Sequence, residues 1–120
     1  MKLEVGQFAR LKSGYICKII NINDYREPNM KYGVEANYLK DVMFIGDDDV
    51  VKASYNIIDI LEEGDYVNGC YIQEIKSLKN NVMVCMLDSD YEFVSTITNN
   101  EIETIVTKEQ FEQMAYKVGE

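Results

Sequence analysis

The densest group of potentially reactive side chains in this sequence is Asp47-Asp48-Asp49, a run of three carboxylates. Carboxylate oxygens are the ligands that Mg²⁺ and Ca²⁺ prefer. An EF-hand calcium loop, however, places its ligands at alternate positions and adds a distant glutamate, and that spacing is absent here. Because Gly46 precedes the run, we interpret it as a solvated turn and expect no metal site.

The groups that most enzymes need are missing from the sequence. It has no histidine, which is the commonest general base, no glycine-rich phosphate loop and no G-x-S-x-G nucleophile motif. Cys17, Cys70 and Cys85 are widely spaced in apolar runs without a C-x-x-C pair, so we expect core thiols in a reducing cytoplasm. The sequence therefore predicts neither catalysis nor a cofactor.

Charge is distributed unevenly along the chain. Residues 62–120 hold twelve acidic and four basic residues, whereas residues 1–61 hold nine and eight. The second half thus carries eight of the nine surplus negative charges. Such a surplus repels nucleic acid and attracts basic surfaces, although it also serves plain solubility.

Two groups of carboxylates alternate along the chain in this acidic half. Side chains at alternate positions of a strand share one face, so the groups predict a negative stripe that imitates the phosphate rows of a nucleic acid. The alternative is an ordinary solvated strand face. The predicted partner-binding carboxylates are Asp88, Asp90, Glu92, Glu101 and Glu103.

Basic and aromatic residues gather instead in the first half. Arg10, Lys12 and Lys18 lie in the first expected hairpin and form an alternative nucleic-acid contact. Basic residues that alternate with aromatics bind single strands by charge and stacking, but the net charge of −9 opposes this. Three tyrosines of the next connection are either partner contacts or core residues: Tyr25, Tyr32 and Tyr38.

Short strands separated by turn residues are predicted throughout the first half. A hairpin covers 8–20, and a second hairpin covers 42–54 with its turn in the acidic run. The long connection 23–40 lies between them and contains a short strand or helical turn near 32–39. Residues 56–61 form a closing strand or a 3₁₀ segment.

The second half follows the same plan. Asn68-Gly69 is the strongest hairpin signal of the chain, and strands are expected at 82–87 and 91–94. The closing strand 102–106 aligns with 56–61.

The openings of the two halves are also alike. The two stretches are "VGQFARLKSGYICKII" at 5–20 and "EEGDYVNGCYIQEI" at 62–75. Each contains, in this order, a glycine, a polar residue, an aromatic residue and a small apolar residue. Each continues with a second glycine, an aromatic residue and an isoleucine. Units this small bury little surface alone. We therefore expect two β units, 1–61 and 62–106, that pack together.

A helix is predicted over 107–120. Thr107 and Gln110 have the spacing of a capping box. Gly119 is the expected terminator of this helix. One face of the helix is apolar, so we expect the helix to cover a barrel end or a sheet edge. Docking to a partner is the alternative. That face consists of Phe111, Met114, Ala115 and Val118.

The residues Val5-Gly6, Phe8, Arg10, Lys12, Gly14-Tyr15-Ile16 and Lys18-Ile19 resemble the opening of small SH3-like barrels of the KOW type. This resemblance implies a mainly β fold made of two tandem SH3-like units with one C-terminal helix. It also implies, as an alternative function, a KOW-like adaptor for nucleic acid or ribonucleoprotein.

The phrases "NIIDILEEGDYVNG", "YIQEI" and "ETIVTKEQFEQMAYKV" resemble small proteins of phages and prophages of low-GC Gram-positive bacteria. Inhibitors of host defence nucleases, including anti-CRISPR proteins, are frequent among such proteins. The resemblance therefore implies a non-catalytic, cytoplasmic inhibitor that binds a basic host protein, with a phage structural or assembly component as a further alternative. The start of the chain has no apolar signal segment, and no run is long enough to span a membrane.

Overall fold

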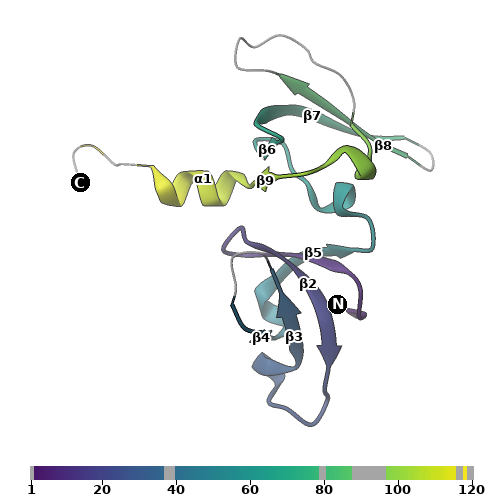
Figure 1. The fold of residues 1–120 in the computed structure, drawn as a ribbon, viewed down its shortest axis with the longest axis vertical. Helices are drawn as coiled ribbons and strands as arrows, with labels where there is room; N and C mark the ends of the chain where they lie inside the picture. Colours follow the sequence, from purple (N-terminus) through teal and green to yellow (C-terminus); the bar gives the residue numbers. More distant parts are fainter. Residues whose placement is uncertain (1, 37–39, 79–80, 88–96, 116–117, 119–120) are drawn as a thin grey trace. The chain divides into compact units, whose positions relative to one another are not determined.

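The protein is described by a computed structural model that covers all residues except 1, 37–39, 79–80, 88–96, 116–117 and 119–120. The described strands form one five-stranded and one four-stranded antiparallel sheet, and a helix follows them (Figure 1). The predicted mainly β fold is confirmed. The chain divides into two compact units, Met1–Ile60 and Leu61–Glu120.

The first unit contains a β-meander whose first strand also pairs with its last. The sheet order is β4-β3-β2-β1-β5, and all pairs are antiparallel. Its strands are β1 (Phe8–Leu11), β2 (Ile16–Ile22), β3 (Tyr32–Glu35), β4 (Met43–Ile45) and β5 (Val50–Ser54). Its 3₁₀ helices are η1 (Pro28–Met30), η2 (Asp47–Asp49) and η3 (Ile57–Ile60).

One face of this sheet forms the core of the unit. Ala9, Ile19 and Val34 are fully buried and lie on the neighbouring strands β1, β2 and β3. The alternation of the strands places these apolar side chains on the same face. Cys17 belongs to this core, as the sequence predicts for it.

The predicted hairpin over 42–54 is wrong. Strand β5 pairs with β1, with Ala9 opposite Ala53, and not with β4. The acidic run forms η2 instead of a hairpin turn, and the N–H of Lys12 donates to Asp49 O at 3.0 Å. The 3₁₀ turn thus leads the chain to the far edge of the sheet, where β1 provides the partner strand.

The second unit has the sheet order β8-β7-β6-β9. Its strands are β6 (Tyr66–Val67), β7 (Cys70–Leu78), β8 (Asn81–Leu87) and β9 (Ile105–Val106). The 3₁₀ helix η4 (Asn99–Glu101) precedes β9, and the helix α1 (Lys108–Met114) follows it. The expected strand at 91–94 lies outside the described residues.

The opening turns of the two units have matching hydrogen bonds. Gly6 has a φ of 97° and donates to Ile19 O at 2.7 Å. Gly64 has a φ of 98° and donates to Ile72 O at 3.0 Å. Both turns need a left-handed residue, which explains why both are glycine.

The residue after each glycine closes its turn in the same way. The Gln7 side chain accepts the N–H of Glu4 at 2.9 Å. The Asp65 side chain accepts the N–H of Glu62 at 2.8 Å. A side chain that accepts a nearby backbone N–H is a common way to hold a turn.

The second strands of the units also share an irregularity. The register of β2 with β3 shifts between Ile19 and Asn21, and that of β7 with β8 shifts between Ile72 and Glu74. Ile19 and Ile72 are the residues that meet the opening glycines, so the two bulges occupy equivalent positions. The units therefore share a strand plan as well as a sequence pattern, whereas their assignment to SH3-like barrels stays a prediction.

The structure corrects the alignment of 56–61 with 102–106. Residues 57–60 are the 3₁₀ helix η3, whereas 105–106 form β9. By strand pairing, β9 corresponds to β5, because each pairs antiparallel with the first strand of its unit. A 3₁₀ helix precedes each of these strands. In both 3₁₀ helices, the side chain of the third residue accepts the N–H of the residue just before the helix.

The C-terminal helix is shorter than predicted and its apolar face is not buried. α1 ends at Met114, and Ala115 has a ψ of 135°. None of its residues is buried. A helix this short has little stability of its own without tertiary packing of its apolar face.

Candidate interaction surface

The predicted acidic stripe is described only at its second group of carboxylates, because Asp88, Asp90 and Glu92 lie outside the described residues. Glu101 ends η4 and Glu103 lies in the segment between η4 and β9. The prediction that these two alternate along one strand is therefore wrong. Both side chains are nevertheless exposed.

Glu101 and Glu103 are held in place by local hydrogen bonds. Glu101 accepts from the N–H and the hydroxyl of Thr98 at 3.0 and 2.9 Å. The Asn68 amide oxygen accepts the N–H groups of Glu103 and Thr104 at 2.8 and 3.0 Å. Two exposed carboxylates thus stand on a backbone that the hairpin turn fixes.

Two lysines of the second unit are engaged by glutamates of the same unit. Lys108 Nζ lies 2.7 Å from Glu62 and Lys76 Nζ lies 3.9 Å from Glu74. These lysines are half of the four basic residues in 62–120. Both ion pairs lie within the unit and leave its surplus of eight negative charges unchanged.

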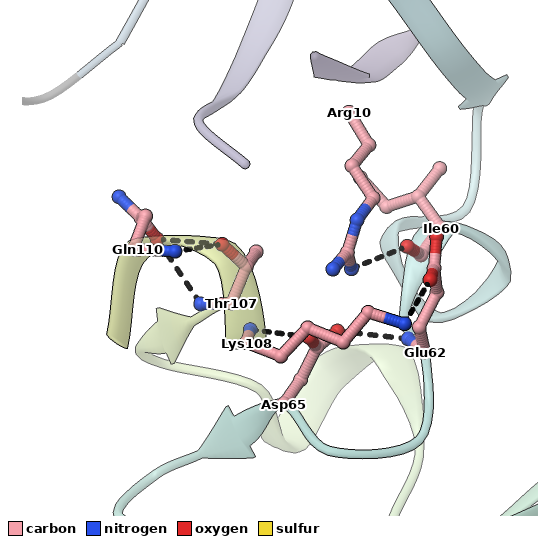
Figure 2. Close-up of polar contacts among 7 residues, drawn as sticks. All are labelled: Arg10, Ile60, Glu62, Asp65, Thr107, Lys108 and Gln110. Atoms are coloured by element: carbon pink, nitrogen blue, oxygen red, sulfur yellow. Dashed lines mark hydrogen bonds and ion pairs between the residues drawn. The ribbon is translucent and has the colours of Figure 1, made fainter. Parts of the chain in front are cut away.

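The start of α1 is fixed by a buried carboxylate. Asp65 is fully buried and accepts the N–H of Lys108 at 2.9 Å as well as that of Glu62 (Figure 2). Thr107, also fully buried, and Gln110 form the predicted capping box, with Gln110 N donating to Thr107 Oγ1 at 3.3 Å. The first turn of the helix is thereby tied to the opening turn of the unit.

The apolar side chains of α1 contrast with its fixed start. Phe111 stacks on Tyr66 with ring centroids 5.3 Å apart, yet it is 53% exposed. Met114 is 77% and Val118 86% exposed. Figure 1 shows α1 continuing from β9 away from β7 and β8. Phe111 and Met114 form the exposed α1 face, and Val118 lies beyond the end of the helix. The sequence pattern had predicted that these residues cover a barrel end or a sheet edge, with docking to a partner as the alternative.

The three tyrosines predicted as partner contacts have different environments. Tyr25 is fully exposed, and Tyr38 lies outside the described residues. Tyr32 is a core residue, 2% exposed, and its hydroxyl donates to Asp47 at 2.7 Å. Burial, followed by this hydrogen bond, raises the pKa of Tyr32. Tyr32 is therefore corrected from a contact to a structural residue.

The basic hairpin contact is corrected at Arg10. Arg10 is fully buried and donates from Nη1 to Ile60 O at 3.1 Å (Figure 2). Lys12 and Lys18 are exposed, and Lys18 lies over the Phe8 ring at 5.7 Å. Because Arg10 is buried, the hairpin offers a phosphate two cations, Lys12 and Lys18, rather than three.

The acidic run 47–49 has a structural role. Asp49 accepts the N–H of Gly46 at 3.0 Å, and Asp47 accepts from Tyr32. A Cβ at Gly46 would lie 2.5 Å from Pro28 O, so the close approach of η1 and η2 requires glycine. Among the described residues, no group of three or more acidic or cysteine side chains is arranged to hold a metal ion.

The cysteines differ in accessibility. Burial raises the pKa of the Cys17 thiol to about 11, so this group is a poor nucleophile at neutral pH. Cys70 is partly buried. The Cys85 side chain lies outside the described part of the structure.

Comparison of the chain with protein-family models, with curated proteins and with solved structures found no match. Within the described ranges, no helix is both long and apolar enough to cross a membrane. Function must therefore be argued from the site itself.

Proposed function

We propose that this protein is a non-catalytic interaction protein that binds the basic surface of another protein through residues 62–120. The observation that carries this proposal is the charge of the second unit, a surplus of eight negative charges. Two of its lysines are already engaged by its own glutamates. Like-charge repulsion disfavours nucleic acid as the direct ligand, and a basic protein is the complementary one.

The partner that this surface fits best is a protein that handles nucleic acid. The groove of such a protein is lined with lysine and arginine, and a carboxylate-rich surface competes with phosphates for it. The resemblance to phage-encoded inhibitors leads us to propose a host defence enzyme of the bacterial cytoplasm. Binding in the groove would inhibit that enzyme without any chemistry.

The adaptor alternative has less support. A KOW-like contact would use Arg10, which is buried, together with Lys12 and Lys18. The loss of one cation of three weakens a surface whose affinity depends on phosphate neutralisation.

The test is affinity capture from a bacterial host lysate with quantitative mass spectrometry. The test variant combines Asp88→Lys, Asp90→Lys and Glu92→Lys. The control combines Glu27→Lys, Asp41→Lys and Asp48→Lys, which are exposed residues of the first unit, so both variants change the net charge equally.

We expect the test variant to lose a partner that the wild type and the control retain. Equal retention by both variants would contradict a role for the acidic half. Equal loss would show that only net charge matters.

A further inference from the structure

The proposed function leaves open which side chains contact the partner. We infer that the exposed α1 face, Phe111 and Met114, together with Val118 beyond the helix end, is the docking element, and that its occupant is an apolar groove bordered by basic residues on the partner protein. This inference rests on the proposed function and specifies how the acidic unit binds.

The start of the docking element is held by hydrogen bonds to buried residues. Buried Asp65 accepts the N–H of Lys108, and buried Thr107 caps the helix (Figure 2). These hydrogen bonds fix the first turn of α1 before binding. An ordered contact loses less conformational entropy when a partner arrives.

Large apolar side chains that follow this fixed start are exposed. Met114 and Val118 are at least 77% exposed, whereas the strand residues Val67 and Ile72 of the same unit are fully buried. Aromatic residues and methionine are enriched in the centres of protein interfaces. An amphipathic helix with such residues typically lies in a hydrophobic groove.

The charge beside these apolar side chains selects the occupant. Glu109 and Glu112 lie on the same helix as Phe111 and Met114, and Glu101 and Glu103 lie in the segment just before β9. A groove that accepts the apolar side chains brings its border close to these carboxylates. Basic border residues would complement them.

The same charges disfavour other occupants. Two copies joined through α1 would bring the glutamates of the two helices together. Anionic lipid surfaces are repelled for the same electrostatic reason.

The experiment measures binding of the full chain to three synthetic probes by isothermal titration. The first is an amphipathic peptide of leucine and lysine with helical periodicity, which presents an apolar surface between basic side chains. The second is oligolysine with the same number of lysines. The third is oligoglutamate. The test variant is Met114→Ser with Val118→Ser, and the control is Val5→Ser with Val51→Ser.

Serine at all four positions leaves the charge unchanged, and all four valine or methionine side chains are exposed in the wild type. We expect the wild type to bind the leucine–lysine peptide about tenfold more tightly than oligolysine, and the test variant to lose this preference. The control should keep it. Circular dichroism checks that both variants remain folded.

Several results would overturn the inference. Equal affinity of the wild type for the two basic peptides, or equal losses in test and control variants, would exclude α1 as the docking element while leaving the proposed function intact. No preference for either basic peptide over oligoglutamate would overturn the proposed function itself.

Two further measurements address the competing occupants. Sedimentation velocity that shows self-association of the wild type but not of the test variant would make a second copy the occupant. Flotation with uncharged lipid vesicles that depends on Met114 and Val118 would show that a lipid surface is the occupant. Either result would overturn the inference, and a monomer that does not float supports it.

Discussion

Tyr32 shows how a single residue can be misjudged from sequence. A tyrosine in a charged connection is typical of a surface contact, but Tyr32 is buried and donates to Asp47. Its partner comes from the acidic run that also caps η2. The pairing could not be predicted, because it depends on the register of β3 with β4, in which Tyr32 lies opposite Ile45.

Tyr32→Phe removes this hydrogen bond while keeping the ring. Since Asp47 is exposed and can be hydrated again, we expect a loss of about 1 kcal/mol in the free energy of unfolding, measured by urea denaturation. Tyr25→Phe, at a fully exposed position, is the matched control and should change nothing. Equal stability of Tyr32→Phe and wild type would contradict the assignment.

Burial of Tyr32 and its hydrogen bond to Asp47 also make the stability of the protein depend on pH. The pKa of Tyr32 is raised from its ordinary value of 10.0, chiefly by burial and then by Asp47. A raised folded-state pKa gives stability that is complete below the ordinary value and is lost as pH rises through the raised one. The stability difference between wild type and Tyr32→Phe should therefore narrow above pH 10.

Cys17 offers a second prediction at the level of one residue. Burial raises its pKa from 9.0 to about 11, so its thiolate fraction near neutral pH falls about a hundredfold. In a chain with Cys70→Ser and Cys85→Ser, Ellman's reagent should react with the folded protein at least a hundredfold more slowly than with the urea-unfolded one. Similar rates in both states would show that Cys17 is accessible.

Among the elements, hairpins with clear turn chemistry were predicted best. The pairing of β1 with β2 and of β6 with β7 follows the predicted turns, and Asn68 and Gly69 have φ values of 51° and 81°. Local residues determine such pairs. The pairing of β5 with β1 was missed, because it joins strands that are distant in sequence.

The Asn68 side chain also connects its turn to the segment before β9. Its amide nitrogen donates to Glu101 O at 2.8 Å, and its oxygen accepts from Glu103 and Thr104. Asn68→Gly keeps the positive φ but removes these three bonds, so we expect a loss of about 1–2 kcal/mol in thermal or urea unfolding. Asn68→Asp, which keeps the acceptor, should lose less. An unchanged stability of Asn68→Gly would show that the three bonds are not important.

The C-terminal helix illustrates the limit of periodicity. The capping box at Thr107 and Gln110 was predicted and is confirmed. Of the predicted apolar face, Phe111 and Met114 lie on α1, whereas Ala115 and Val118 lie beyond its end. A pattern also does not say whether its face is covered by the same chain or by a partner. Met114 is exposed in the described structure, and docking of this face to a partner stays a prediction.

At the scale of the whole molecule, the repeated strand plan and the uneven charge are the two features that the sequence already indicated. The repeat is supported by equivalent glycine turns and by equivalent bulges in β2 and β7. The charge of 62–120 is a property of composition, which requires no structure. The candidate contact residues depend on exposure, and for that reason Arg10 and Tyr32 were misassigned.

The charge surplus predicts a strong effect of salt on binding. Raising the ionic strength shortens the Debye length from about 10 Å at 0.1 M to about 3 Å at 1 M. We expect the association rate with the leucine–lysine peptide to fall with salt, while the dissociation rate changes more in the variant with Met114→Ser and Val118→Ser. Stopped-flow fluorescence with a labelled peptide measures both rates. An association rate independent of salt would contradict electrostatic attraction.

The most direct test of the central claim, that residues 62–120 bind a basic partner through α1, is hydrogen–deuterium exchange of the full chain with and without the leucine–lysine peptide. The account predicts slower exchange in 108–115 on binding and little change in 8–22. Protection confined to 8–22, with 108–115 unchanged, would contradict it and place the binding surface on the first hairpin.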